Sequence, residues 1–134
     1  MRVALLLLGL TVVSCAPRHS TVATPRTEVL RDVEGYAIAS CLTIQTQPYL
    51  KDQGDAWASV IVQRAKGSLD VLTGVAEQVK RENAKGNMAV IREEEGQGKD
   101  KLLPVLYCGE IIDRSSVRAA IQKAVVELAP SYEQ

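Results

Sequence analysis

Three cysteines and a single histidine are the residues of this chain best suited to covalent chemistry or metal binding. The cysteines are Cys15, Cys41 and Cys108, and the histidine is His19. A serine or cysteine nucleophile needs an imidazole within hydrogen-bond reach, but His19 lies in the aperiodic, proline-containing stretch APRHSTVATPR. Two distant cysteines also cannot complete a four-cysteine zinc site. We therefore predict that the protein is not an enzyme and that it holds no metal and no cofactor.

The N-terminus has the features of an export signal. Arg2 precedes an apolar run at residues 3–13, which is shorter than the roughly 20 residues that span a bilayer but fits a signal peptide. The following VVSC, ending at Cys15, resembles the lipobox of bacterial lipoproteins. We expect residues 1–14 to be removed, Cys15 to be lipidated, and residues 15–26 to form a flexible tether to the outer membrane in the periplasm. The alternative is an ordinary signal peptide whose cleavage site contains a cysteine, which also predicts export.

Cys41 and Cys108 remain as a pair once Cys15 is assigned to the anchor. Both fall on the apolar faces of predicted helices, and in an exported protein such a pair is expected to form a disulfide. The bond would cross-link residues 67 positions apart and stabilise the fold by roughly 2–4 kcal/mol. The alternative is a pair of free thiols that pack as small hydrophobic side chains.

Apolar residues at three- and four-residue spacing predict the elements that carry these cysteines. We expect Pro48 to end the first helix, Asp52 to cap the second, Ser68 to cap the third and Pro130 to close the last. The folded domain, residues 27–134, is predicted to be all-α, a compact bundle of about five helices with one intradomain disulfide. The apolar positions predicted to face the core are Val29, Leu30, Val33, Tyr36, Ala37, Cys41 and Ile44; Trp57, Val60, Ile61 and Ala65; Leu69, Leu72, Val75, Ala76 and Val79; Leu102, Val105, Leu106, Cys108, Ile111 and Ile112; and Val117, Ala120, Ile121, Ala124, Val125 and Leu128.

The composition narrows the classes of partner. The chain has 16 basic and 16 acidic side chains and a formal net charge of zero. Because no basic stripe stands out, nucleic acid is not expected as a partner. Aromatic residues are scarce, with one tryptophan, four tyrosines and no phenylalanine, so the core must be aliphatic, which favours packed helices over a small β-sandwich.

Three segments resemble a known family. They are YAIASCLTI around Cys41, DAWASVIVQRA at residues 55–65, and CGEIIDRSSVRAAI from Cys108. Their layout, over about residues 28–128, resembles the immunity proteins of type VI secretion amidase effectors. The resemblance implies a periplasmic, non-catalytic protein, in some cases a homodimer, that binds a peptidoglycan amidase of the papain-like fold and occludes its active-site groove. Two other possibilities are a small structural lipoprotein that scaffolds an envelope complex, and a domain that binds a small molecule between its helices.

Residues 84–100 interrupt the helical pattern with a long, charged segment. Long loops in compact domains are usually functional or disordered, and the resemblance implies that this one enters the amidase groove. Its apolar residues would anchor the contact and its charges would orient it. The alternatives are disorder, packing of Val90 and Ile91 into the core, and a solvated acidic run that lacks the residue spacing of a calcium loop. The predicted partner-binding residues are Asn87, Met88, Val90, Ile91, Arg92, Glu93, Glu94 and Glu95.

Overall fold

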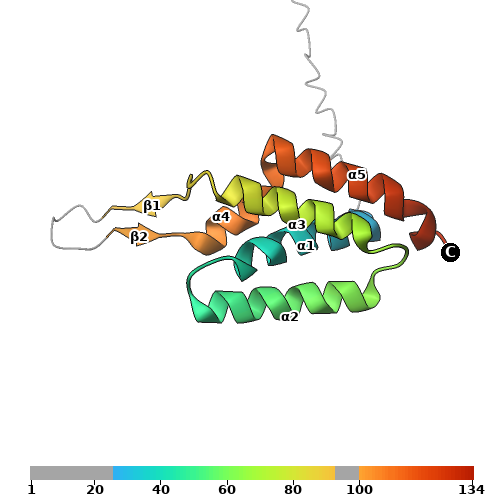
Figure 1. Cartoon of the computed structure of the whole chain (residues 1–134), viewed down its shortest axis with the longest axis horizontal. Coiled ribbons are helices and arrows are strands. Elements are labelled where there is room, and N and C mark those ends of the chain that lie inside the picture. Colours follow the sequence, from blue (N-terminus) through green and yellow to red (C-terminus); the bar gives the residue numbers. More distant parts are fainter. Residues whose placement is uncertain (1–25, 93–99) are drawn as a thin grey trace, which may run out of the picture.

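The computed structural model of the protein describes residues 26–92 and 100–134. Within these residues the chain forms five α-helices, one 3-10 helix and two short strands (Figure 1). The elements are α1 (Glu28–Thr43), α2 (Pro48–Arg64), α3 (Asp70–Asn83), β1 (Val90–Ile91), β2 (Lys101–Leu102), α4 (Pro104–Glu110), η1 (Ile111–Asp113) and α5 (Ser115–Tyr132). The predicted all-α bundle of about five helices is confirmed. The predictions for the signal peptide, Cys15, nearly all of the tether, and Glu93, Glu94 and Glu95 concern residues outside the described ranges.

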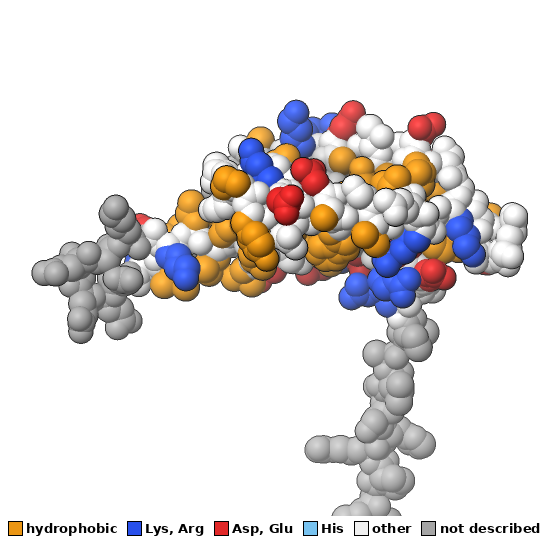
Figure 2. All heavy atoms as spheres, turned by 90° about the horizontal axis from the view of Figure 1, so that it is seen from below, with side chains coloured by type: hydrophobic (Ala, Val, Ile, Leu, Met, Phe, Trp, Pro, Cys, Tyr) orange, Lys and Arg blue, Asp and Glu red, His pale blue; other side chains and the backbone are white. Residues whose placement is uncertain are grey.

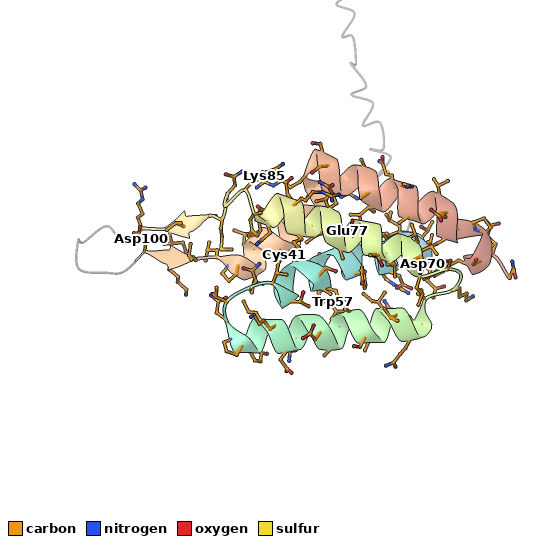
Figure 3. The ribbon with its side chains drawn as sticks, in the orientation of Figure 1. Cys41, Trp57, Asp70, Glu77, Lys85 and Asp100 are labelled. Atoms are coloured by element: carbon orange, nitrogen blue, oxygen red, sulfur yellow. A yellow bond between two sulfur atoms is a disulfide. The ribbon has the colours of Figure 1, made fainter. Side chains whose placement is uncertain are left out.

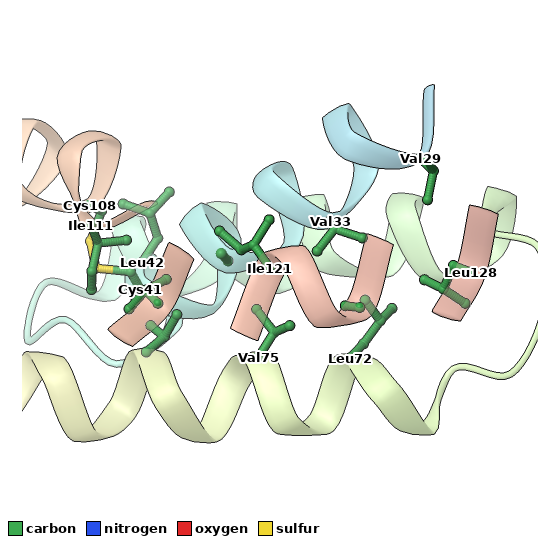
Figure 4. Close-up of a cluster of buried hydrophobic side chains, with 14 of the residues drawn as sticks. Val29, Val33, Cys41, Leu42, Leu72, Val75, Cys108, Ile111, Ile121 and Leu128 are labelled. Carbon is green, nitrogen blue, oxygen red and sulfur yellow. A yellow bond between two sulfur atoms is a disulfide. The ribbon is translucent and has the colours of Figure 1, made fainter. Parts of the chain in front are cut away.

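Helix α1 is the centre of the bundle. It packs against α2, α3 and α5, and its C-terminal end meets α4 and η1 (Figure 1). The helix begins after Thr27, whose hydroxyl oxygen accepts a hydrogen bond from the backbone N–H of Leu30 at 3.4 Å, as N-cap residues do. Its two ends therefore face different parts of the molecule: the start lies beside the C-terminal end of α5, and the end lies beside α4 (Figure 4).

The core is aliphatic and lies mainly between α1, α3 and α5. Val33 from α1, Val75 from α3 and Ile121 from α5 are buried and belong to one hydrophobic cluster (Figure 4). Val117, Ile121, Ala124 and Leu128 follow one face of α5 and are buried, as predicted. Removing such aliphatic side chains from water is the main favourable contribution to folding.

Helix α2 is an outer helix, and this position corrects two predictions. Among the described helices it packs chiefly against α1, so only Gly54 and Ile61 of α2 are buried, whereas Trp57 and Val60 are exposed. A Cβ added to Gly54 would lie 2.7 Å from the backbone nitrogen of Thr43, which shows how closely the two helices approach. Close approach of two backbones is a use of glycine.

Proline positions account for the misplaced helix boundaries. Pro48 begins α2 instead of ending α1, and Asp52 lies inside α2 and does not cap it. Proline is tolerated at a first helical position because its missing N–H has no partner there. Pro130 lies within α5, which continues to Tyr132, and the third helix begins at Asp70 without a side-chain cap from Ser68.

A buried carboxylate joins three helices at the end of the bundle where α1 begins. Asp32 of α1 is 1% exposed. Its Oδ1 lies 2.5 Å from Nη2 of Arg64, at the end of α2, and its Oδ2 accepts a hydrogen bond from the hydroxyl of Tyr132 of α5 at 3.0 Å. Burial, and next the hydrogen bond to Asp32, raise the pKa of Tyr132. A buried charge needs such partners, because an unpaired one would strongly destabilise the fold.

The predicted disulfide is confirmed at the other end of α1. The sulfur atoms of Cys41 and Cys108 are 2.07 Å apart, and the bond joins α1 to α4 (Figure 3). Both residues are fully buried. The bond therefore fixes α4, a helix of only seven residues, to the central helix.

Replacing both cysteines, Cys41→Ala with Cys108→Ala, is expected to lower the free energy of unfolding by about 2–4 kcal/mol, because the denatured chain is no longer cross-linked. Urea unfolding of the oxidised proteins, followed by circular dichroism, measures the difference. A reducing agent should destabilise the unaltered protein and leave the double variant unchanged. A double variant as stable as the oxidised parent protein would contradict the expectation.

Candidate protein-binding surface

The segment between α3 and α4 forms a hairpin that projects from the bundle (Figure 1). Its strands β1 and β2 are antiparallel, with Val90 opposite Leu102 and Ile91 opposite Lys101. The backbone N–H of Leu103 donates a further hydrogen bond to the carbonyl of Ala89 at 3.1 Å. The strands pack chiefly against each other and not against the helices, so their side chains face solvent.

The hairpin and α4 together expose a run of large apolar side chains. Exposed fractions are 42% for Val90, 50% for Ile91, 53% for Leu102, 63% for Val105 and 46% for Leu106. Val90 and Leu102 are paired on one face of the hairpin and Ile91 lies with Lys101 on the other, because successive side chains of a strand alternate between its faces. These five residues, on both faces of the hairpin and on α4, are named the hairpin–α4 surface. Figure 2 shows hydrophobic side chains gathered at this end of the molecule, beside the grey atoms, with a cationic side chain among them. Apolar side chains that cluster on a surface are typical of protein interaction sites.

Part of this surface was expected to be buried. Leu102, Val105 and Leu106 were predicted to face the core, but Leu102 belongs to β2 and the other two lie on the outer side of α4. Helix α4 buries Cys108, as predicted, and Tyr107, which was not among the predicted core positions. Pro104 is the signal that could have placed Leu102 outside the helix, since a proline suits a first helical position and disfavours helical backbone at the residue directly before it, Leu103.

The residues predicted to bind a partner divide into two groups. Asn87, Val90, Ile91 and Arg92 are exposed, so the alternative that Val90 and Ile91 pack into the core is wrong. Met88 is half-buried and packs against the hydrophobic cluster, which makes it a support for the hairpin. A binding role for these residues stays a prediction.

A buried glutamate, Glu82, fixes the base of the hairpin where the chain leaves α3. Oε2 of Glu82, at the end of α3, lies 2.6 Å from Nζ of Lys85 and accepts a hydrogen bond from the hydroxyl of Ser116 at 2.9 Å. The hydroxyl of Tyr107 donates to the backbone carbonyl of Glu82 at 3.4 Å. The contacts join α3 to α5 and to α4 at the point where the chain leaves for the hairpin. Burial, and next the charge of Glu82, raise the pKa of Tyr107.

A buried glutamine, Gln45, contacts the disulfide at the base of the hairpin. Nε2 of Gln45 donates to the carbonyl of Cys41 at 2.8 Å and to Oδ1 of Asn83 at 3.2 Å. The same nitrogen lies 3.5 Å from the sulfur of Cys108. One side chain therefore contacts the ends of α1 and α3 and the disulfide that holds α4.

The described residues include no free cysteine, no histidine and no cluster of metal ligands. The only histidine, His19, lies outside them, and both described cysteines are in the disulfide. In residues 26–92 and 100–134 no three histidine, cysteine, aspartate or glutamate side chains gather as metal ligands would. No helix in these ranges has the length and apolar character to cross a membrane. What the geometry offers is a surface for binding.

The acid stability of the protein is expected to depend on Glu82. Hydrogen bonds from Lys85 and then Ser116 lower its pKa from the ordinary 4.5. A carboxyl whose pKa is depressed by folding contributes stability above its unfolded pKa and loses it as the pH falls through the folded value. The free energy of unfolding should therefore decrease as the pH drops below about 4.5. The Glu82→Gln variant should lose less of this free energy over the same pH interval.

Urea midpoints measured across the acid range test this expectation. Glu77→Gln is the matched control, because Glu77 lies on the same helix with an exposed side chain, 3.9 Å from Arg81. Glu77→Gln should retain the acid dependence of the unaltered protein. Equal acid slopes for Glu82→Gln and the unaltered protein would contradict the role of Glu82.

Comparisons with family profiles, with curated proteins and with solved structures each found no match to this chain. Inference about its function therefore rests on the residues themselves, on the hairpin that projects from the bundle, and on the hairpin–α4 surface.

Proposed function

We propose that this chain is an exported immunity protein that binds a type VI secretion peptidoglycan amidase and inhibits it by occluding its active-site groove. The observation that carries the proposal is the projecting hairpin, which presents Val90, Ile91 and Leu102 to solvent on a base fixed by the disulfide. The likeness of the segments around Cys41 and Cys108 to amidase immunity proteins supports the choice of enzyme.

The hairpin has a shape suited to a groove. Two paired strands are only about 4.8 Å apart, so the described pair of β1 and β2 is narrow and extended, as is the peptide substrate of a papain-like enzyme. Val90 and Ile91 would supply apolar anchors, which tend to dominate the energy of an interface. Filling the groove excludes substrate from the catalytic cysteine and histidine and requires no chemistry from the inhibitor.

The fixed base of the hairpin favours tight binding. Ordering a loose loop on association costs free energy, and a segment held in its bound conformation avoids much of that cost. The disulfide, Gln45 and Glu82 hold the elements on both sides of the hairpin. The free energy gained from contacts of the apolar side chains is then not offset by a cost of ordering the hairpin base.

Cations on the hairpin would orient the encounter. Arg92 and Lys101 are both exposed and lie beside the apolar residues. Charges at the rim of an interface act mainly on association rate and register. Acidic residues around the amidase groove would complement them.

The second candidate is a structural lipoprotein that scaffolds an envelope complex. The outer face of α2 favours it, because Tyr49 and Val60 are 71% and 52% exposed on a helix whose main neighbour is α1. The two candidates differ in the surface that matters: the hairpin for the inhibitor and α2 for the scaffold.

The double substitution Ile91→Ala with Arg92→Glu is expected to weaken amidase binding by about tenfold or more, because it removes one apolar anchor and reverses one charge. The proposed function predicts that a gene beside this one encodes a cysteine amidase. Calorimetry with that enzyme measures the dissociation constant, and peptidoglycan hydrolysis measures inhibition. The fold should be retained, since both side chains are exposed.

The matched control is Val126→Ala with Lys123→Glu, which makes the same kinds of change at exposed positions of α5. Its affinity should equal that of the unaltered protein. If the hairpin variant binds as tightly as this control, the hairpin does not carry the inhibition. No binding to the amidase, together with co-purification of envelope proteins that is lost on substitution of Tyr49 and Val60, would favour the scaffold.

We also propose that the mature protein is held at the outer membrane through a lipid on Cys15. Helix α1 runs about 20 Å from its start near Glu28 to the disulfide, so a tether that joins at Glu28 leaves the hairpin at the far end of α1. The mass of the mature protein is expected to include acyl chains on an N-terminal Cys15. Cys15→Ser should release the protein from the membrane fraction, whereas an unacylated mature chain would contradict the anchor.

A further inference from the structure

A small pocket opens at the base of the hairpin, beside the end of α1. Its volume is about 200 Å³. It lies between the chain leaving α1, the start of α2, and the two sides of the hairpin base. The lining residues that matter most are Ile44, Gln47, Asn83, Met88, Leu102 and Tyr107.

None of the described residues that line this pocket carries a charge, although 24% of the chain is charged. Four other surface hollows of the described chain each include charged side chains. The wide hollow between α3 and α5, for example, is lined in part by Asp70, Arg81, Lys123 and Glu127. The pocket at the hairpin base is therefore distinguished by chemistry and not by size.

The polar side chains that line the pocket are the amides of Gln45, Gln47 and Asn83 and the hydroxyls of Thr46 and Tyr107, and part of the hydrogen-bonding capacity of the amides is free. Asn83 uses Oδ1 to accept the hydrogen bond from Gln45, which leaves its NH₂ group without an acceptor among the described residues. The side chain of Gln47 likewise makes no hydrogen bond within the described chain and gives α2 no side-chain cap. Free amide donors and acceptors suit backbone amide groups, whereas Ile44, Met88 and Leu102 suit an apolar side chain.

We propose that this pocket receives an uncharged loop of the same amidase, one apolar side chain with its neighbouring backbone amides. The inference rests on the proposed function, because it takes the amidase as the occupant. Leu102 belongs both to the hairpin–α4 surface and to the pocket, so an enzyme that accepts the hairpin in its groove brings the rim of that groove against the pocket.

The absence of charge selects the occupant. A charged side chain entering this pocket would lose its hydration and meet no opposite charge in the lining, which is strongly unfavourable. A neutral loop loses less hydration, displaces the pocket's water and pairs its backbone with Asn83 and Gln47. The pocket thus determines which amidases fit, while the hairpin blocks catalysis.

Gln47→Glu tests the proposal because it places a charge in the pocket with little change of shape. The substitution should not harm the fold, since Gln47 is the residue before Pro48 at the N-terminal end of α2 and a negative charge is favourable there. Binding to the cysteine amidase encoded by the neighbouring gene is expected to weaken by about tenfold or more. The control is Gln53→Glu, the same change on the exposed surface of α2 outside the pocket, which should bind normally.

Thr46→Trp is a second variant, which occupies the pocket by volume without adding charge. It should also weaken binding, and thermal unfolding should confirm that both variants remain folded.

If Gln47→Glu and Thr46→Trp bind as tightly as Gln53→Glu while the hairpin variant binds weakly, the pocket proposal is overturned and the proposed function stands. If the unaltered protein does not bind the amidase, both are overturned. A shift in sedimentation of the protein alone, caused by Gln47→Glu, would assign the pocket to a second copy and also overturn the proposal.

Discussion

The Cys41–Cys108 disulfide joins the last turn of α1 to α4, and β2 of the hairpin leads directly into α4. A helix of seven residues is too short to be stable by itself in water. Helix α4 packs on α1 and η1, and the covalent link holds it there. Without that link one leg of the hairpin would leave the bundle from a mobile element, and the apolar side chains would have no fixed direction.

The rest of the bundle provides a rigid support for this link. Helix α1 has two buried carboxylates. Asp32 pairs with Arg64 at the C-terminal end of α2, and Glu34 pairs with Arg118 of α5. The arginines are partly exposed, but removing either one would leave a buried carboxylate without its cation, which is destabilising. These contacts therefore help to fix the relative positions of α1, α2 and α5. The proposed anchor and the hairpin are then held at opposite ends of α1.

The sequence was informative where one face of a helix alone determines burial, as in α5, whose predicted apolar face is the face that packs. It was misleading where a helix has few neighbours. Trp57 and Val60 fit a helical period, but the spacing of residues cannot reveal that α2 packs chiefly on α1. The strands β1 and β2 have two residues each, too few to show an alternating pattern. The sequence could not reveal the uncharged pocket, because the residues that line it come from three separate segments of the chain.

The exposed apolar residues of the hairpin are themselves an argument for a partner. A two-stranded hairpin is marginally stable, and one with two paired residues in each strand depends on its base for order. A connection from α3 to α4 that served only to close the chain would need no valine, isoleucine or leucine in solvent. Their exposure raises the free energy of the isolated protein relative to a polar connection. A partner that covered Val90, Ile91 and Leu102 would remove that cost, and the disulfide would hold the base of the hairpin in place for it.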